Sequence, residues 1–288
     1  MAILLTGNSK IIVQGITGHQ GQFHTKAMLN FGTNVVAGVT PGKAGENVYG
    51  VKVYDNVRSA VDETKADTAV VFVPAPFVKD AVIEDIDAGL SLVVIVTEHV
   101  PFHDVIDLLE YGQSKVTRII GPNCPGIASS GLSKAGIIPN SILKPGNIGV
   151  LSRSGTLTYE IVNQITKAGL GESTVIGLGG DKVVGSTFTD LLSLFENDAQ
   201  TSAVVMVGEI GGSAEEDAAD FIKKNFSKPV IGFIAGKYAP PGKRMGHAGA
   251  IISGNKGTAN SKITALESAG ALIAASPEEV PRLLLESI

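Results

Sequence analysis

The chain contains one cysteine and few charged residues, and each of these shortages excludes certain classes of protein. Of its 288 residues, 18% are charged and 44% are hydrophobic, against about 25% charged in a typical globular protein. A single cysteine excludes an internal disulfide and a zinc site with several cysteine ligands. Long disordered segments do not fit this composition. We therefore expect a packed chain in a reducing compartment, either the cytoplasm or an organelle matrix such as that of mitochondria.

Long apolar runs and an excess of positive charge are also missing. No run approaches the roughly 20 apolar residues that a membrane span requires, and the start, Met1–Leu5, lacks the basic region of a signal peptide. Lys and Arg number 23 against 28 Asp and Glu, a net charge of −5, which disfavours nucleic acid because phosphate neutralisation needs a basic surface. We expect neither a membrane nor a nucleic-acid partner, and any anionic ligand must be held locally.

Short apolar, β-branched runs alternate with segments of helical spacing, the pattern of parallel βαβ sheets. The predicted strands are 10–14, 34–39, 68–73, 92–96, 117–120, 148–152, 174–178, 203–207 and 230–234. The predicted helices are 22–31, 78–88, 103–111, 157–168, 187–195, 214–225 and 262–269. Turn residues outnumber periodic ones between Gly121 and Gly146. This predicts two doubly wound α/β domains, 1–125 and 146–288, joined by a linker over 126–145.

Glycine is the residue in excess, with 35 in the chain, and three of them form a loop after the first predicted strand. The loop Gly15–Gly21 opens a helix, where backbone N–H groups can face a phosphate; the alternative is a tight turn with no ligand. NAD would require an acidic residue at the end of the second strand. Lys43 stands there instead. This disfavours a dehydrogenase and favours a phosphorylated adenosine ligand, unless Lys43 is a solvated loop residue.

Two further strand ends in the N-terminal half are candidates for ligand contact, because ligands bind outside the carboxyl ends of parallel strands. Val73–Pro76 forms a rigid rim that is poor in donors. Thr97 and Glu98 follow the next strand. Their side chains can bond a ligand or cap the following helix.

The C-terminal half carries a second candidate phosphate site, a carboxylate and a histidine. Ser152–Tyr159 is a turn of small residues that starts a helix, whose first N–H groups are unpaired. Glu209 follows a buried strand, where it could also cap a helix, and His247 lies in a Gly- and Pro-rich loop with small neighbours. The alternative for this histidine is a surface residue without chemistry. Gly236–Arg244 is only a near miss to a nucleotide-binding P-loop, and the histidines show no metal-binding spacing.

Taken together, these motifs resemble the α subunits of succinyl-CoA synthetases, also called succinate–CoA ligases, from end to end. The matching stretches are Gln14–Gln20, Gly38–Lys43, Val73–Pro76, Gly121–Gly126, Ser152–Glu160, Gly208–Glu215 and Gly242–Ile252. The resemblance implies a Rossmann-like CoA-binding domain followed by a flavodoxin-like ligase domain. It also implies a β subunit that binds ATP or GTP with Mg²⁺, in an αβ or α2β2 assembly.

The resemblance further implies the reversible conversion of succinate, CoA and a nucleoside triphosphate into succinyl-CoA, nucleoside diphosphate and phosphate, a step of the tricarboxylic acid cycle. His247 is similar to the phosphorylated histidine of the family, and Glu209 to the carboxylate that fixes its tautomer. Ser154 and Gly155 match the phosphate-binding helix start, and Tyr159 matches a neighbour of the acid substrate. The positions similar to CoA contacts are Thr17, Gly18, His19, Gln20, Lys43, Val96, Thr97 and Glu98. No metal site is implied in this chain.

The sequence departs from the family pattern at a few places and leaves two other functions open. Gly179–Lys182 ends in lysine where the family commonly has proline, a change that bears on the subunit contact or on the charge near the phosphate loop. The stretches 129–134 and 253–256 also differ. A related ligase, for example one that uses malate, would share His247 and differ in its acid pocket. A CoA-binding module without catalysis would bind CoA and form no phosphohistidine.

Overall fold

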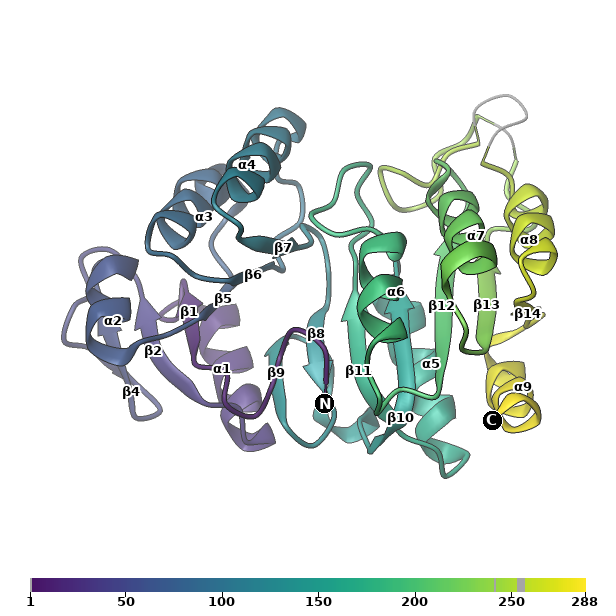
Figure 1. Ribbon diagram of the computed structural model, residues 1–288. Helices are drawn as coiled ribbons and strands as arrows, with labels where there is room; N and C mark the ends of the chain where they lie inside the picture. The colour runs from purple at the N-terminus through teal and green to yellow at the C-terminus, as the bar shows by residue number, and fades with distance from the viewer. Residues whose placement is uncertain (1, 241, 253–256) are drawn as a thin grey trace. The chain divides into compact units, whose positions relative to one another are not determined.

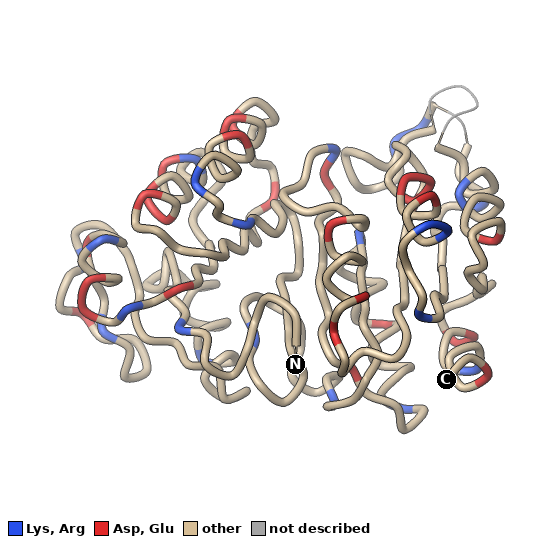
Figure 2. Tube along the Cα trace, viewed as in Figure 1, with Lys and Arg blue, Asp and Glu red and all other residues tan. Residues whose placement is uncertain are grey.

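The computed structural model describes residues 2–240, 242–252 and 257–288 and divides the chain into two compact units (Figure 1). The N-terminal unit comprises Leu4–Asn140 and Val183–Gly185, and the C-terminal unit comprises residues 2–3, Ser141–Lys182 and Ser186–Ile288. The departing stretch 253–256 lies outside the described residues. Acidic and basic residues are interspersed along the chain in both units (Figure 2).

The sheet of the N-terminal unit has the strand order of a Rossmann fold. Its parallel strands run in the order β4-β2-β1-β5-β6-β7, which corresponds to the 3-2-1-4-5-6 order of dinucleotide-binding domains. A short antiparallel strand, β3, extends the edge beside β4. The bounds are β1 Ile11–Gln14, β2 Val35–Val39, β3 Asn47–Val48, β4 Val51–Tyr54, β5 Thr68–Val71, β6 Leu92–Ile95 and β7 Arg118–Ile120.

Helices cover both faces of this sheet, which is why its central strands are continuous apolar runs. Helices α2, α3 and α4 pack in series on one face, over a core that includes the fully buried Ile12, Val71 and Val93. Helix α1 follows β1 and contacts strand β9. The bounds are α1 His19–Phe31, α2 Val57–Thr64, the 3-10 turn η1 Ala75–Phe77, α3 Val78–Asp87 and α4 Phe102–Ser114.

The segment predicted as a linker over 126–145 differs from that expectation. Strands β8 (Gly126–Ser129) and β9 (Ser133–Gly136) form an antiparallel hairpin, and the division between the two units falls at Asn140, before β10 begins. The Ser129 hydroxyl donates to the Leu5 carbonyl over 2.6 Å, and the buried Lys134 ammonium donates to the Ile138 carbonyl over 2.7 Å. Polar side chains make these contacts, so the two strands do not show the alternation of apolar and polar residues by which a strand is predicted from sequence.

The C-terminal unit has the other common doubly wound topology. Its parallel strands follow the order β11-β10-β12-β13-β14, which is the 2-1-3-4-5 order of flavodoxin-like folds. The buried strands β10, β12 and β13 form its centre. The bounds are β10 Pro145–Ser152, β11 Glu172–Gly177, β12 Ala203–Glu209, β13 Val230–Ala235 and β14 Leu272–Ile273.

Helices α6, α7 and α8 pack on one face of this sheet, and α5 packs with α9 on the other (Figure 1). Side-chain caps define several starts: Ser154 accepts the N–H of Leu157 at α5, and Thr187 with Asp190 forms a capping box at α6. The bounds are η2 Asn140–Ile142, α5 Gly155–Lys167, α6 Phe188–Glu196, α7 Ala214–Asn225, α8 Ala259–Ser268, η3 Pro277–Glu279 and α9 Val280–Ser287.

Every predicted strand and helix has a counterpart, and the predicted pair of doubly wound domains is confirmed. The elements missing from the prediction are short: β3, β4, α2, β8, β9, β14 and α9. Among the described residues, no helix combines the length and the apolar character needed to cross a bilayer.

His24 on α1 links the stability of the N-terminal unit to pH. Its ring stacks on Phe72 with centroids 5.4 Å apart, and its pKa is lowered to about 4, first by burial and then by the positive charge of Lys134. In the unfolded chain a histidine titrates near 6.5. Between these pH values the unfolded chain binds more protons than the folded one, so folding stability falls as the pH drops through this window.

We predict that His24→Phe, which keeps a ring on Phe72, reduces the loss of stability between pH 7 and pH 5 by about 1 kcal/mol. Thermal or urea unfolding at the two pH values measures this difference. His103→Phe at the exposed start of α4 is the matched control and should lose as much stability as the native chain. Equal losses in all three proteins would show that His24 does not carry the effect.

Candidate active site

His247 and Glu209 meet at the carboxyl ends of the C-terminal strands. Glu209 is the last residue of β12, and His247 lies in the loop that follows β13. The ring Nδ1 is 2.8 Å from Glu209 Oε2, and the His247 side chain is 29% exposed against 9% for Glu209. Glu209 does not cap the next helix: α7 begins after Ser213 without a side-chain cap. The structure therefore brings together the histidine and the carboxylate that the sequence suggested as a pair.

This contact determines which ring nitrogen is free. An ionised carboxylate only accepts hydrogen bonds, so Nδ1 carries the proton that faces Glu209 Oε2. The lone pair of the neutral ring then lies on Nε2. A histidine held in this way is a nucleophile through Nε2, and the carboxylate stabilises the positive charge that the ring gains when it reacts.

The pKa of His247 is raised above its ordinary value of 6.5, first because of the hydrogen bond with Glu209. Partial burial and the nearby Arg153 oppose this rise, whereas Asp181 adds to it. Because the pKa is raised, a larger share of the ring is protonated at neutral pH. The nucleophilic form gains as the pH rises through this pKa.

Gly180 provides the space in which the His247 ring lies. A Cβ atom built at Gly180 would stand 2.5 Å from two ring carbons of His247, a distance that real side chains do not reach. The loop after β11 therefore supports the ring with bare backbone. Lys182, the departure from the family pattern, is exposed two residues further on.

The start of helix α5 lies at the same edge of the sheet. Residue Ser152 of β10 pairs with Val207 of β12, and the next residue, Arg153, places Nη2 3.4 Å from Glu209 Oε1. Ser154 then caps the helix, and Gly155 is its first residue. The unpaired N–H groups of this helix start and its dipole favour an anion. Tyr159 follows one turn later and is half-buried.

A second candidate site lies in the N-terminal unit, where the glycine loop lines a cavity of about 660 Å³. Four predicted ligand contacts line it together: Thr17, Gly18, His19 and Gln20. Helix α1 approaches the loop closely, since a Cβ atom at Gly21 would stand 2.1 Å from the Gly15 carbonyl oxygen. The backbone N–H groups at the start of α1 are therefore available to a phosphate in this cavity.

Lys43 lines an adjoining pocket of about 350 Å³, which shares Thr17 with the larger cavity. Its ammonium is 2.9 Å from Glu46 Oε1, and both side chains are about half exposed. The structure thus places a cation beside the glycine loop. This cation is already paired, and an incoming phosphate has to compete with Glu46.

The predicted contacts Val96, Thr97 and Glu98 do not line either pocket within the described residues. Thr97 does not cap a helix either: its hydroxyl donates to the Val73 carbonyl over 2.7 Å, and Val73 lines the larger cavity. Glu98 is exposed. This segment supports the rim of the cavity through Thr97.

Several residues of both sites were missing from the sequence analysis. Phe72, Phe77 and Glu84 line the larger cavity, and Arg153 and Gly180 contact the Glu209–His247 pair. Phe77 was detectable because it directly follows the rim Val73–Pro76. Where the chain is described, no group of three or more histidine, cysteine, aspartate or glutamate side chains is arranged to hold a metal ion.

Comparison with known proteins agrees with this division into two sites. Residues 6–99 match the family described as CoA binding domain, and residues 151–272 match the family described as CoA-ligase. The two matches contain the glycine loop and the Glu209–His247 pair respectively. These two matches place the chain in the class of CoA ligases.

Individual relatives narrow this class. The chain is 57% identical over 286 residues to succinate–CoA ligase [ADP-forming] subunit alpha 2 of Archaeoglobus fulgidus, covering 99% of both chains. It is 53% identical to the corresponding alpha subunit of Staphylococcus aureus, covering all of this chain and 95% of that one. The chain belongs to the family of succinate–CoA ligase α subunits.

A solved structure supports the fold of the whole chain. ATP citrate lyase of Methanothrix soehngenii, in complex with citrate and coenzyme A, superimposes with a TM-score of 0.88 at 25% identity. The match covers 99% of this chain and 51% of that enzyme. The chain thus spans about half the length of the lyase.

We predict that Gly180→Ala lowers the ligase activity at least tenfold, a change equivalent to about 1.4 kcal/mol in the barrier, because the added methyl group displaces the ring from Glu209. Stability should hardly change. The downfield NMR signal of the His247 Nδ1 proton reports the contact directly. Gly7→Ala is the control, since its Cβ atom meets only Leu132, at 3.9 Å. An unchanged Nδ1 signal and full activity in Gly180→Ala would contradict this role.

Proposed function

We propose that the chain is the α subunit of a succinate–CoA ligase and that His247 carries the phosphoryl group between the nucleotide and succinate. The observation that supports this most directly is the 2.8 Å contact between His247 Nδ1 and Glu209 Oε2. It leaves Nε2 as the nucleophile at a strand edge where a helix start favours an anion.

In the first half of the reaction, the Nε2 lone pair of His247 attacks the γ-phosphorus of the nucleoside triphosphate. The bond to the bridging oxygen breaks, and the nucleoside diphosphate leaves with that electron pair. The Nδ1 proton stays with the ring, where Glu209 balances the new positive charge. The Gly155 N–H at the start of α5 binds the phosphoryl oxygens without reorganising, beside Ser154, whose own N–H donates to Ser152 Oγ over 3.2 Å.

In the second half, a carboxylate oxygen of succinate attacks the phosphorus, and the P–N bond returns its electron pair to Nε2. The product is succinyl phosphate. The CoA thiolate then attacks the carbonyl carbon, the C–O bond breaks, and phosphate leaves as succinyl-CoA forms. We assign Tyr159 to the neighbourhood of the succinate carboxylate, because it lies one turn past the helix start.

We assign CoA to the cavity of the N-terminal unit. Thr17, Gly18, His19 and Gln20 present the start of α1 to its phosphates, and Lys43 exchanges its pairing with Glu46 for a phosphate on the adenosine end. In this proposal Thr97 supports the rim through its hydrogen bond to the Val73 carbonyl, and Val96 and Glu98 adjoin Thr97 in the chain. The match of residues 6–99 to the CoA binding domain family supports the assignment.

We further propose a β subunit as partner, in an αβ or α2β2 enzyme, that binds ATP or GTP with Mg²⁺. Two observations support this. The relatives are named as alpha subunits, and the loop Gly236–Arg244 departs from a P-loop in length and in its last residue. The bacterial and archaeal relatives favour a cytoplasmic enzyme.

The two competing functions are less well supported. A ligase for another acid, such as malate, would share the whole phosphate site, but the relatives named above are succinate–CoA ligases. A CoA-binding module without catalysis would have no use for a buried carboxylate bonded to a histidine. The Glu209–His247 contact therefore argues against the module.

We predict that His247→Asn abolishes phosphoryl capture and turnover while CoA binding stays within twofold of the native value, because the CoA cavity lies in the other unit. The chain is copurified with its β subunit and given ³²P-labelled ATP or GTP with Mg²⁺, and acid-labile, base-stable label is counted. Label on the native enzyme that succinate plus CoA discharges also identifies the nucleotide. Turnover by His247→Asn above the level that contaminating native enzyme explains would contradict the mechanism.

We predict that Lys43→Glu weakens binding of CoA by at least about tenfold more than binding of dephospho-CoA, because a charge reversal acts mainly on the phosphate that the second ligand lacks. Isothermal titration with both ligands measures the two losses. Lys52→Glu is the matched control, since Lys52 is an exposed lysine paired with Glu63 in the same unit. Equal losses for both ligands would show that Lys43 does not contact that phosphate.

A further inference from the structure

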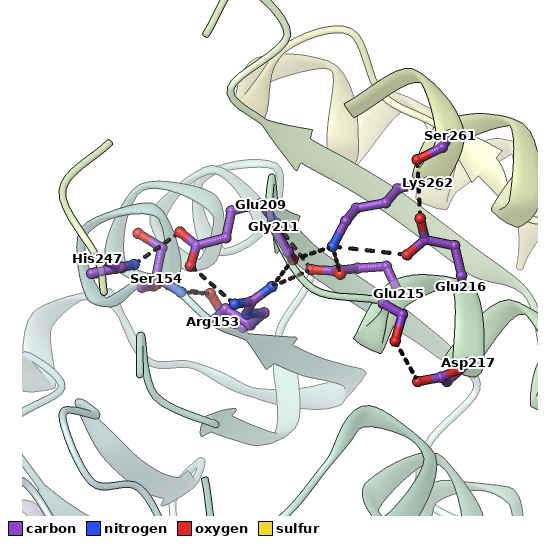
Figure 3. A network of polar contacts seen from close by, with 12 residues as sticks. Arg153, Ser154, Glu209, Gly211, Glu215, Glu216, Asp217, His247, Ser261 and Lys262 are labelled. Atoms are coloured by element: carbon purple, nitrogen blue, oxygen red, sulfur yellow. Dashed lines mark hydrogen bonds and ion pairs between the residues drawn. The ribbon is translucent and has the colours of Figure 1, made fainter. Parts of the chain in front are cut away.

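Behind Glu209 lies a chain of buried charges that the proposed reaction does not use. Arg153 follows β10, Glu215 lies in the first turn of α7, and Lys262 lies on α8 (Figure 3). The side chains of Glu215 and Lys262 are 0% exposed. Glu215 bonds both cations: its Oε1 is 3.1 Å from Arg153 Nη1, and its Oε2 contacts Lys262 Nζ. Lys262 Nζ is also 3.9 Å from Glu216 Oε2, so the two buried cations face three carboxylates, those of Glu209, Glu215 and Glu216.

The contacts of Arg153 decide how it meets Glu209. Its Nη1 donates to Glu215 Oε1 and also to the Gly211 carbonyl, over 3.2 Å. Only Nη2 faces Glu209, at 3.4 Å from Oε1, and that oxygen accepts no hydrogen bond from the described residues. An arginine free to turn would form a two-pronged pair with a carboxylate. Here the contacts of Nη1 with Glu215 and the Gly211 carbonyl keep the guanidinium from forming that bidentate pair with Glu209.

Glu215 also fixes the backbone of Glu209. Its Oε1 accepts the N–H of Glu209 over 3.1 Å, and Lys262 Nζ donates to the Gly211 carbonyl over 2.7 Å. The contacts thus hold the chain on both sides of Ile210. Because Arg153, Glu215 and Lys262 are buried and bonded to one another and to this backbone, the arrangement has little freedom to relax.

We propose that Glu215 and Lys262 are positioning residues for the Glu209–His247 pair, an inference that rests on the phosphohistidine role proposed above. Glu215 restrains Arg153, so that Glu209 keeps its bond to His247 Nδ1 instead of forming a bidentate pair with the guanidinium. Lys262 compensates the charge of Glu215 and holds it in place. The network thereby keeps Nε2 as the free nitrogen.

The proposal predicts a specific change in the ring. Without the restraint, Arg153 pairs with Glu209, and His247 Nδ1 loses its acceptor. The neutral ring then populates the form protonated on Nε2, and its pKa falls. The charged groups facing the ring from the three neighbouring strand ends are Glu209, Arg153 and Asp181. A remote charge would shift the pKa through space but would leave the tautomer unchanged.

The test is a pH titration of the His247 ring in the full chain by long-range ¹H–¹⁵N NMR, which separates the two tautomers. Two variants are used. Glu215→Gln keeps the shape and weakens the acceptor for Arg153. The double variant Glu215→Met with Lys262→Met removes one charge of each sign, so the net charge is unchanged. Spectra of His247→Asn assign the signals among the five histidines.

We expect the native ring to carry its proton on Nδ1. In both variants the form protonated on Nε2 should appear and the pKa of His247 should fall, by about one unit in the double variant, the size of one charged hydrogen bond. The control is Glu172→Gln, a buried glutamate at the start of β11 that bonds the backbone N–H of Lys144. It should leave the ring unchanged.

A folded Glu215→Gln chain with the native tautomer would overturn the proposal, even if its pKa had shifted, because that result indicates charge acting through space. Glu215→Gln decides alone if the double variant does not fold. The proposed function is judged separately. Absence of label on the native, partnered enzyme contradicts the phosphohistidine role, whereas the ring titration needs no phosphorylation and reports on the network alone.

Discussion

The hydrogen bond between Glu209 and His247 is the interaction on which the C-terminal unit's chemistry depends. It needs a carboxylate that is only 9% exposed, and leaving a charged group unpaired in the interior costs several kcal/mol. The structure meets this demand with Arg153 on one side and the imidazole on the other. The same carboxylate that makes the ring nucleophilic is therefore also the group that the surrounding fold has to stabilise.

In both units the candidate binding site lies at the carboxyl ends of parallel strands. In the N-terminal unit the glycine loop after β1 presents the start of α1 to a cavity, and in the C-terminal unit Ser154 and Gly155 open α5 beside Glu209. A helix start attracts anions without a net charge on the chain. This explains how a protein with a net charge of −5 can have two candidate anion sites.

The fold was predictable from the sequence because the buried strands are continuous apolar runs, and Glu209 was a candidate because it stands at the end of one of them. His247 lies further along a loop, and its small neighbours and the family resemblance pointed to it. His247 and Glu209 are 38 residues apart, yet Glu209 ends β12 and His247 lies in the loop after the neighbouring strand β13. What the sequence did not reveal depends on tertiary packing. The hairpin of β8 and β9 depends on side chains such as Lys134 that bond backbone carbonyls. The role of Gly180 becomes visible only when the ring of His247 lies against it.

The central claim is that the hydrogen bond to Glu209 keeps the proton on Nδ1 of His247, so that Nε2 is the nitrogen that reacts. The most direct measurement is the identity of the phosphorylated ring nitrogen. The enzyme is copurified with its β subunit, labelled with ¹⁵N in histidine and loaded with the nucleotide, and its ³¹P–¹⁵N couplings are recorded. The account predicts phosphate on Nε2 of His247, with the Nδ1 proton retained. Phosphate on Nδ1 would contradict it, because that nitrogen is the one bonded to Glu209.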